Sequence, residues 1–258
     1  MENNQFIIRW TSPDEIRFYE TPLGTLRSVT SYLKVLAKPA LINWAANTTA
    51  EYIKDKLIEI KEGQLDIEAM DINEIVRAAK QHHKEKLEAG GKRGTDIHYA
   101  INEYWATGII PDETIKENKE TAILFQSFLK WQKECQIMPI SHEQTVYSKH
   151  GYAGTLDLFA EVNKYPQCSE ASWPLGSYII DYKTGKAIYD EAKLQVAAYL
   201  YALQERGPLI NCKGIMIVRF YPGNYEIKVY DRQTCRRLFT AFLHLVKYVN
   251  TLTILGRS

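Results

Sequence analysis

The chain has 258 residues, of which 45% are apolar and 24% are charged, and its formal net charge is +1. This composition is ordinary for a soluble globular protein, and the length is enough for one large domain or for a core with an added subdomain. Because the bulk charge neither favours nor excludes a nucleic-acid partner, any phosphate-binding surface must be local.

The N-terminal sequence is typical of an intracellular protein. It also predicts a hairpin as the first structural element. The first residues lack the basic and long apolar regions of a signal peptide, and no apolar run approaches the length of a membrane span. We therefore expect a soluble, cytoplasmic protein with no membrane partner. Residues Phe6–Tyr19 alternate loosely around Ser12-Pro13-Asp14, which is typical of a short hairpin.

Helical patterns follow this hairpin as far as residue 135. The stretch from Ser28 to Ser31 offers N-caps, Pro39 is suited to open a helix, and Gly90-Gly91 is expected to interrupt one. The predicted helical segments are 32–37, 39–60, 71–88, 94–106 and 112–135. We divide the chain into a mostly helical N-terminal region, 1–91, and a core, 92–258.

The pattern changes to strands near Met138. Strands are predicted at 138–150, 151–162, 177–185, 212–221 and 224–230, with helices at 190–206 and 232–252 and a loop from Pro166 to Gly176. The third strand has a near-continuous apolar start and is expected to be central. The fold class is therefore α/β, with a mixed central sheet flanked by helices.

Three charged residues stand in or beside these apolar strands. Asp181 and Lys183 are two positions apart, so they project from the same face of their strand, and Asp157 lies in the preceding strand. Two converging carboxylates suit Mg²⁺ or Mn²⁺, and Lys183 could orient or deprotonate an attacking water. The alternative is a salt bridge between strands, which explains the charges but not their apolar setting.

Two further features favour an active site. Gln195 and Tyr199 share one face of the helix that follows, and a glutamine in an apolar stretch needs hydrogen-bond partners. His98 lies just inside a helix, where a neutral imidazole could complement two carboxylates around a divalent ion. The alternatives are a core aromatic for Tyr199 and a structural role for His98.

The ordered motifs GTDIH, GTLD, DYKTG and QVAAY, between Gly94 and Leu203, resemble the RecB-like branch of the PD-(D/E)XK nucleases. That branch includes the RecB nuclease domain, phage-type exonucleases, the CRISPR adaptation nucleases and a mitochondrial single-strand exonuclease. The resemblance implies a restriction-endonuclease-like fold. It also implies that His98, Asp157, Asp181 and the backbone carbonyl of Tyr182 bind metal, that Lys183 is catalytic, and that Gln195 and Tyr199 position the lysine region and the DNA.

The chain departs from the family pattern at three points. Leu156 replaces the proline of the superfamily name, and Asp181 replaces a more frequent glutamate, which is a longer ligand. No two of the four cysteines, Cys135, Cys168, Cys212 and Cys235, have C-x-x-C spacing, so reduced thiols and no iron–sulfur cluster are expected. That absence argues against the CRISPR adaptation members.

Four residues outside the motifs are weaker candidates. Glu143, in the first strand of the core, could reach the metals, or it could be a surface charge of an edge strand. Lys92 and Arg93 end a locally basic stretch and could bind phosphate. Arg219 lies in an apolar strand and needs a partner, either a DNA phosphate or a carboxylate.

The functional expectation is a Mg²⁺- or Mn²⁺-dependent DNA exonuclease of phage-type replication, recombination or repair, in a bacterium or an infected cell. It would leave 5′-phosphate ends and need a free, single-stranded DNA end, because the N-terminal helices are expected to wall the site into a passage. The alternatives are a flap or junction endonuclease and a non-catalytic DNA-binding module.

Overall fold

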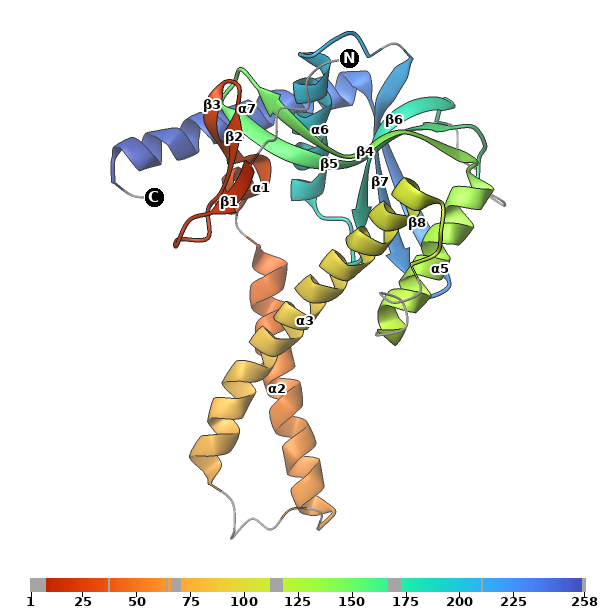
Figure 1. Ribbon diagram of the computed structural model, residues 1–258. Helices are drawn as coiled ribbons and strands as arrows, with labels where there is room; N and C mark the ends of the chain where they lie inside the picture. Colours follow the sequence, from red (N-terminus) through yellow and green to blue (C-terminus); the bar gives the residue numbers. More distant parts are fainter. Residues whose placement is uncertain are drawn as a thin grey trace. The chain divides into compact units, whose positions relative to one another are not determined.

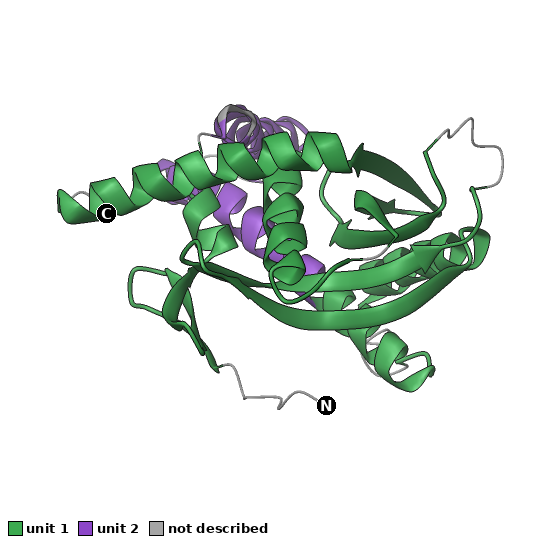
Figure 2. Ribbon diagram, turned by 90° about the horizontal axis from the view of Figure 1, so that it is seen from above, with its two compact units in different colours: residues 1–36, 96–258 green, residues 37–95 purple. Residues whose placement is uncertain are grey.

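A computed structural model of the chain describes residues 8–36, 38–63, 65, 71–111, 118–166, 173–209 and 211–256. It divides into two compact units, one formed by Met1–Leu36 with Asp96–Ser258 and the other by Ala37–Thr95 (Figure 2). This division differs from the expected boundary at residue 91. The reason is that the N-terminal strands belong to the same sheet as the core strands.

The first unit is built on a mixed sheet of eight described strands (Figure 1). The strands are β1 (Ile8–Thr11), β2 (Arg17–Thr21), β3 (Gly24–Ser28), β4 (Ile137–Ser148), β5 (Tyr152–Val162), β6 (Gly176–Lys183), β7 (Cys212–Tyr221) and β8 (Asn224–Asp231). Their order is β1-β2-β3-β5-β6-β7-β8, with β4 paired to β5. The pairs β3–β5 and β6–β7 are parallel and the others antiparallel.

The described helices are α1 (Val29–Leu33), α2 (Pro39–Lys61), α3 (Ile72–Thr107), α5 (Lys119–Glu134), α6 (Asp190–Gln204) and α7 (Arg232–Ile254). Residues of α1, α6 and α7 form one apolar cluster with the sheet. Residues of α5 and of the C-terminal part of α3 form the second. Strand β6 contributes Ile179 to the first cluster and Tyr178, Ile180 and Tyr182 to the second, as alternation along a strand requires.

The α/β class and all five predicted core strands are confirmed, and β6 is central and buried along almost its whole length. The expected N-terminal hairpin is β1–β2, and the expected cap of α1 is Ser28, whose hydroxyl accepts from the Ser31 N–H. Strand β3 was not predicted. It is short, and its residues GTLRS lack the apolar alternation that indicates a strand.

The helix expected to stop at Gly90-Gly91 does not stop there, because α3 continues without a break from Ile72 to Thr107. A helical glycine costs only about 0.5–1 kcal/mol relative to alanine, and the flanking Lys, Glu and Ala residues favour helix. The segment expected to begin a helix at Asp112 lies outside the described residues as far as residue 117. Helix α5 begins after Asn118, which caps it.

None of the helices in the described part of the chain combines the length and apolar character needed to cross a membrane.

Replacing Gly90 and Gly91 together by alanine should stabilise the protein. A Cβ at either position meets no heavy atom within 4 Å, and each alanine should add about 0.5–1 kcal/mol to helix stability. The expected result is a higher midpoint for thermal loss of helical circular dichroism. The control is Gly63→Ala, which should destabilise because Gly63 has a φ of +72°. A lower midpoint for the double variant would contradict a continuous, unstrained α3.

Candidate active site

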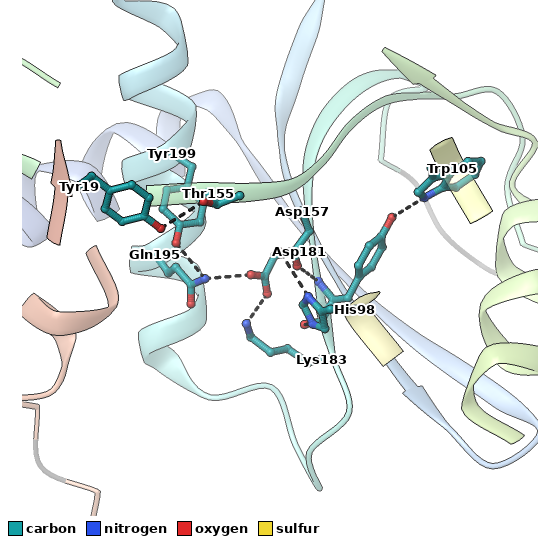
Figure 3. Close-up of polar contacts among 10 residues, drawn as sticks. Tyr19, His98, Trp105, Thr155, Asp157, Asp181, Lys183, Gln195 and Tyr199 are labelled. Carbon is teal, nitrogen blue, oxygen red and sulfur yellow. Dashed lines mark hydrogen bonds and ion pairs between the residues drawn. The ribbon is translucent and has the colours of Figure 1, made fainter. Parts of the chain in front are cut away.

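The candidate site lies where β5 and β6 stop pairing. Their last backbone pair is Leu158 with Ile180, so Asp157 and Asp181 occupy the next position on each strand. Beyond that point the N–H of Tyr182 donates to Asp157 Oδ2 at 2.8 Å. The Asp157 carboxylate therefore takes the place of a backbone acceptor, and both acidic side chains come together at the divergence (Figure 3).

One edge of β5 also lacks a described partner strand over the residues just before Leu158. Strand β4 pairs with one edge of β5 along its length, so β3 and β6 share the other edge. Strand β3 pairs only with Tyr152 and Ala153, and β6 pairs only from Leu158 onwards. Residues 154–157 pair with none of the described strands on that edge, which leaves room for side chains of α6 and of the N-terminal hairpin.

Asp181 is held by two neighbours on the α6 side of the sheet. The ammonium of Lys183 lies 2.6 Å from Asp181 Oδ2, and the Gln195 amide donates to Oδ1 at 3.1 Å. Only 1% of Asp181 is exposed, whereas 28% of the Lys183 side chain is exposed. The lysine is therefore anchored at a buried carboxylate and still reaches the surface.

Burial and charge act in opposite directions on these groups. Burial raises the pKa of Asp181 to about 6, although Lys183 opposes the shift. Burial alone would lower the pKa of Lys183, but the carboxylates of Asp181 and Asp157 raise it, so the lysine is held as an ammonium. A charged lysine stabilises the anionic form of its partner, and this compensates for burying two carboxylates side by side.

Tyr199 orients Gln195 and rests on a glycine. The Gln195 amide lies 3.3 Å from the Tyr199 hydroxyl. A Cβ added to Gly154 would stand only 2.3 Å from Cε1 of the Tyr199 ring. Gly154 is thus the residue that allows the tyrosine to lie against β5 beside Asp181.

His98 joins the site from α3. Its Nδ1 lies 3.4 Å from Asp157 Oδ1, and its Nε2 lies 3.1 Å from the carbonyl oxygen of Tyr182. Burial disfavours the imidazolium, but the Asp157 carboxylate overcomes this and raises the pKa of His98 to about 9. The side chain of Tyr182 fixes the backbone position, because its ring is buried in the second apolar cluster and its hydroxyl accepts a hydrogen bond from Trp105 Nε1.

Glu143 approaches the same point from β4. Its φ of +45° is left-handed, which is uncommon for a non-glycine residue in a strand. One ligand atom each from His98, Glu143 and Asp157 lie within 4.8 Å of one another, so this group could hold a metal ion. Burial raises the pKa of Glu143 and Asp157 raises it further, while the charges of His98 and Arg9 act the other way.

The side chains present fit a divalent cation. The carbonyl oxygen of Tyr182 lies beside the three-residue group, 3.1 Å from His98 Nε2. Carboxylate and carbonyl oxygens with one imidazole are a suitable donor set for Mg²⁺ or Mn²⁺. Asp181 is not part of the three-residue group, since its carboxylate is turned towards Lys183 and Gln195.

The structure brings together six of the residues expected at the site: His98, Asp157, Asp181, Lys183, Gln195 and Tyr199. The three residues expected to bind DNA are not among these six. Arg219 donates from Nε to Glu226 Oε2 at 2.9 Å, so it has the carboxylate partner that was one of its two expected options. Lys92 and Arg93 belong to the second unit, and their role stays a prediction.

Sequence reasoning missed the side chains that support the site from outside the motifs. Tyr19 of β2 lies 3.1 Å from the Thr155 hydroxyl, and only 3% of Tyr19 is exposed. Its position in a short polar hairpin gave no signal of this contact. Gly154 is the first residue of the GTLD motif, and a glycine inside a strand is a signal that could have indicated this close approach.

No protein-family model matches the chain, and no curated protein matches it in sequence.

Gly154→Ala should destabilise the protein by displacing Tyr199. Overpacking of this kind typically costs about 1–3 kcal/mol. Urea denaturation should show this loss in the wild-type background and a clearly smaller loss in Tyr199→Leu, which lacks the ring atoms that the methyl group meets. An equal loss in both backgrounds would mean that the glycine is needed for a different reason.

Proposed function

We propose that the protein is a metal-dependent deoxyribonuclease with the core of a RecB-like PD-(D/E)XK nuclease. The observation that carries this proposal is that Asp157 and Asp181 occupy the first unpaired positions where β5 and β6 diverge, with Lys183 anchored 2.6 Å from the second carboxylate. The order of strands and helices around these residues is compatible with that fold. Two carboxylates, a lysine and an imidazole gathered where two internal strands part are suited to phosphodiester hydrolysis.

His98, Asp157 and the Tyr182 carbonyl would hold the cation, with Asp181 and Glu143 as the further carboxylates beside it. A bound Mg²⁺ or Mn²⁺ ion would neutralise charge on the phosphodiester and lower the pKa of water. To act as a ligand, His98 must give up the proton that Asp157 favours. The carboxylates of Asp157 and Glu143 would then have a divalent ion instead of the imidazolium as their cationic partner.

Lys183 would act on the phosphate as a cation. The carboxylates of Asp181 and Asp157 raise its pKa, which favours an ammonium that orients water and stabilises developing charge over an amine that removes a proton. Gln195 and Tyr199 would be positioning residues, because Tyr199 lies against Gln195 and Gln195 fixes the Asp181 oxygen that Lys183 does not use.

The reaction would be in-line hydrolysis that leaves a 5′-phosphate and a 3′-hydroxyl, with no covalent intermediate. The preferred substrate would be single-stranded DNA with a free end. The proposal assigns the helices of the second unit, α2 and the first part of α3, to control of how DNA reaches the site.

Metal binding and cleavage should separate in two variants. Asp157→Asn should lose Mn²⁺ affinity by about tenfold or more and lose cleavage with it, because a charged ligand is removed. Lys183→Ala should keep most Mn²⁺ affinity and lose cleavage. Calorimetric titration with Mn²⁺ and digestion of end-labelled single-stranded DNA measure the two properties.

The matched controls are Glu161→Gln, an exposed carboxylate on the same strand as Asp157, and Lys193→Ala, which removes a lysine of α6. Both should retain binding and cleavage. Undiminished cleavage by Lys183→Ala would remove its catalytic assignment.

Linear and covalently closed circular single-stranded DNA of one sequence should be degraded very differently. The linear form should be consumed from its ends, while the circle should persist because it offers no end to thread. Gel analysis over time measures both. Comparable degradation of the two forms would replace the exonuclease with an endonuclease.

A further inference from the structure

The N-terminal hairpin presents two arginines on the face that carries Tyr19. Arg9 of β1 is directly opposite Tyr19 of β2, and Arg17 pairs with Thr11 two positions away. Cross-strand partners and residues two apart share a face, so Arg9, Arg17 and Tyr19 all lie on the same side of the hairpin. Arg9 and Arg17 are diagonal neighbours, with about 7–8 Å between such positions.

This face of the hairpin is directed at the candidate site. The Tyr19 hydroxyl lies 3.1 Å from that of Thr155, which is two residues before Asp157 on β5 (Figure 3). Arg9 is also one of the two cationic groups whose charge acts on the Glu143 carboxylate. The hairpin therefore lies near β5 and the carboxylates of Glu143 and Asp157, within the same compact unit.

Both arginines are exposed, and neither guanidinium group makes an ion pair or a hydrogen bond with any of the residues that the structure describes. Three other cations of this unit have partners. Lys34 pairs with Glu15, Arg27 lies over the Tyr32 ring, and Arg219 pairs with Glu226. Arg9 and Arg17 are thus available to an anion that approaches the site.

A substrate phosphate chain needs such cations. The site itself gathers three carboxylates, which repel a polyanion, and the net charge of +1 gives no general attraction. Planar guanidinium groups bind phosphate oxygens in pairs, and their desolvation costs less than that of an ammonium.

We propose that Arg9 and Arg17 bind neighbouring backbone phosphates of the substrate strand, next to the phosphodiester that is cut. The inference rests on the proposed nuclease function and adds the surface that holds the strand in register with the site. The ligand is the phosphate backbone of single-stranded DNA, and the contacts are independent of base sequence.

The test is the salt dependence of DNA binding by the full chain. Fluorescence anisotropy with a labelled oligo(dT) in EDTA, over a series of KCl concentrations, gives the slope of log affinity against log salt. Each phosphate contact on a single strand contributes about 0.7 to that slope. Arg9→Gln and Arg17→Gln should each reduce it by about 0.7, and the double variant by about 1.4.

Two variants serve as controls. Arg9→Lys should keep the wild-type slope, because it retains the charge. Arg237→Gln should also keep it. Arg237 is exposed and lies in the first turns of α7. Helix α7 begins directly after Asp231, which pairs with Gly214 near one end of β7, whereas Lys183 pairs with β7 near its other end. Unchanged thermal midpoints in the two Arg→Gln variants show that the hairpin is folded.

Cleavage with Mg²⁺ is measured in parallel and separates the two proposals. If the wild-type chain binds and cuts DNA but both Arg→Gln variants keep its slope, the assignment of Arg9 and Arg17 is overturned and the nuclease stands. If the wild-type chain neither binds nor cuts DNA, both proposals fail.

Discussion

The separation of β5 from β6 after the Leu158–Ile180 pair is the constraint on which the candidate site depends. Had the strands continued to pair, the Tyr182 N–H would bond to backbone and the Asp157 carboxylate would have no place beside Asp181. Because the strands part, Asp157 satisfies that N–H, and α6 and the N-terminal hairpin approach the open edge. One interruption of the β5–β6 pairing thus brings two carboxylates together beside the edge that α6 and the hairpin approach.

Burying these charges is tolerated because they balance. Asp157 and Asp181 face His98 and Lys183, and each opposite charge favours the charged form of its neighbour against the effect of burial. Such an arrangement has little value for stability alone, since apolar residues of similar size fill a core at lower cost. In the proposed nuclease, a divalent cation would take the place of the proton on His98. This links the energetics of the fold to the proposed chemistry.

Local pattern was sufficient for the core and for most of the site. Strand patterns, including the near-continuous apolar start of β6, identified the five core strands, and the two-residue spacing of Asp181 and Lys183 placed both on one face, which α6 covers in the structure. Features set by distant contacts were not accessible. The pairing of β3 with β5 and the Tyr19–Thr155 contact join residues more than a hundred positions apart, and the left-handed backbone of Glu143 has no counterpart in the local sequence pattern. Gly90-Gly91 misled because the cost of two helical glycines is small in a helix of 36 residues.

The central claim is that this divergence of strands forms a cation-dependent phosphodiesterase. The most direct measurement is the release of nucleotides from 3′-labelled, single-stranded DNA by the wild-type chain, with Mg²⁺ or Mn²⁺ and with EDTA, together with the identity of the new ends. The account predicts release only when a divalent cation is present, and new ends that carry a 5′-phosphate. Release that persists in EDTA, or no release with either cation, would contradict it.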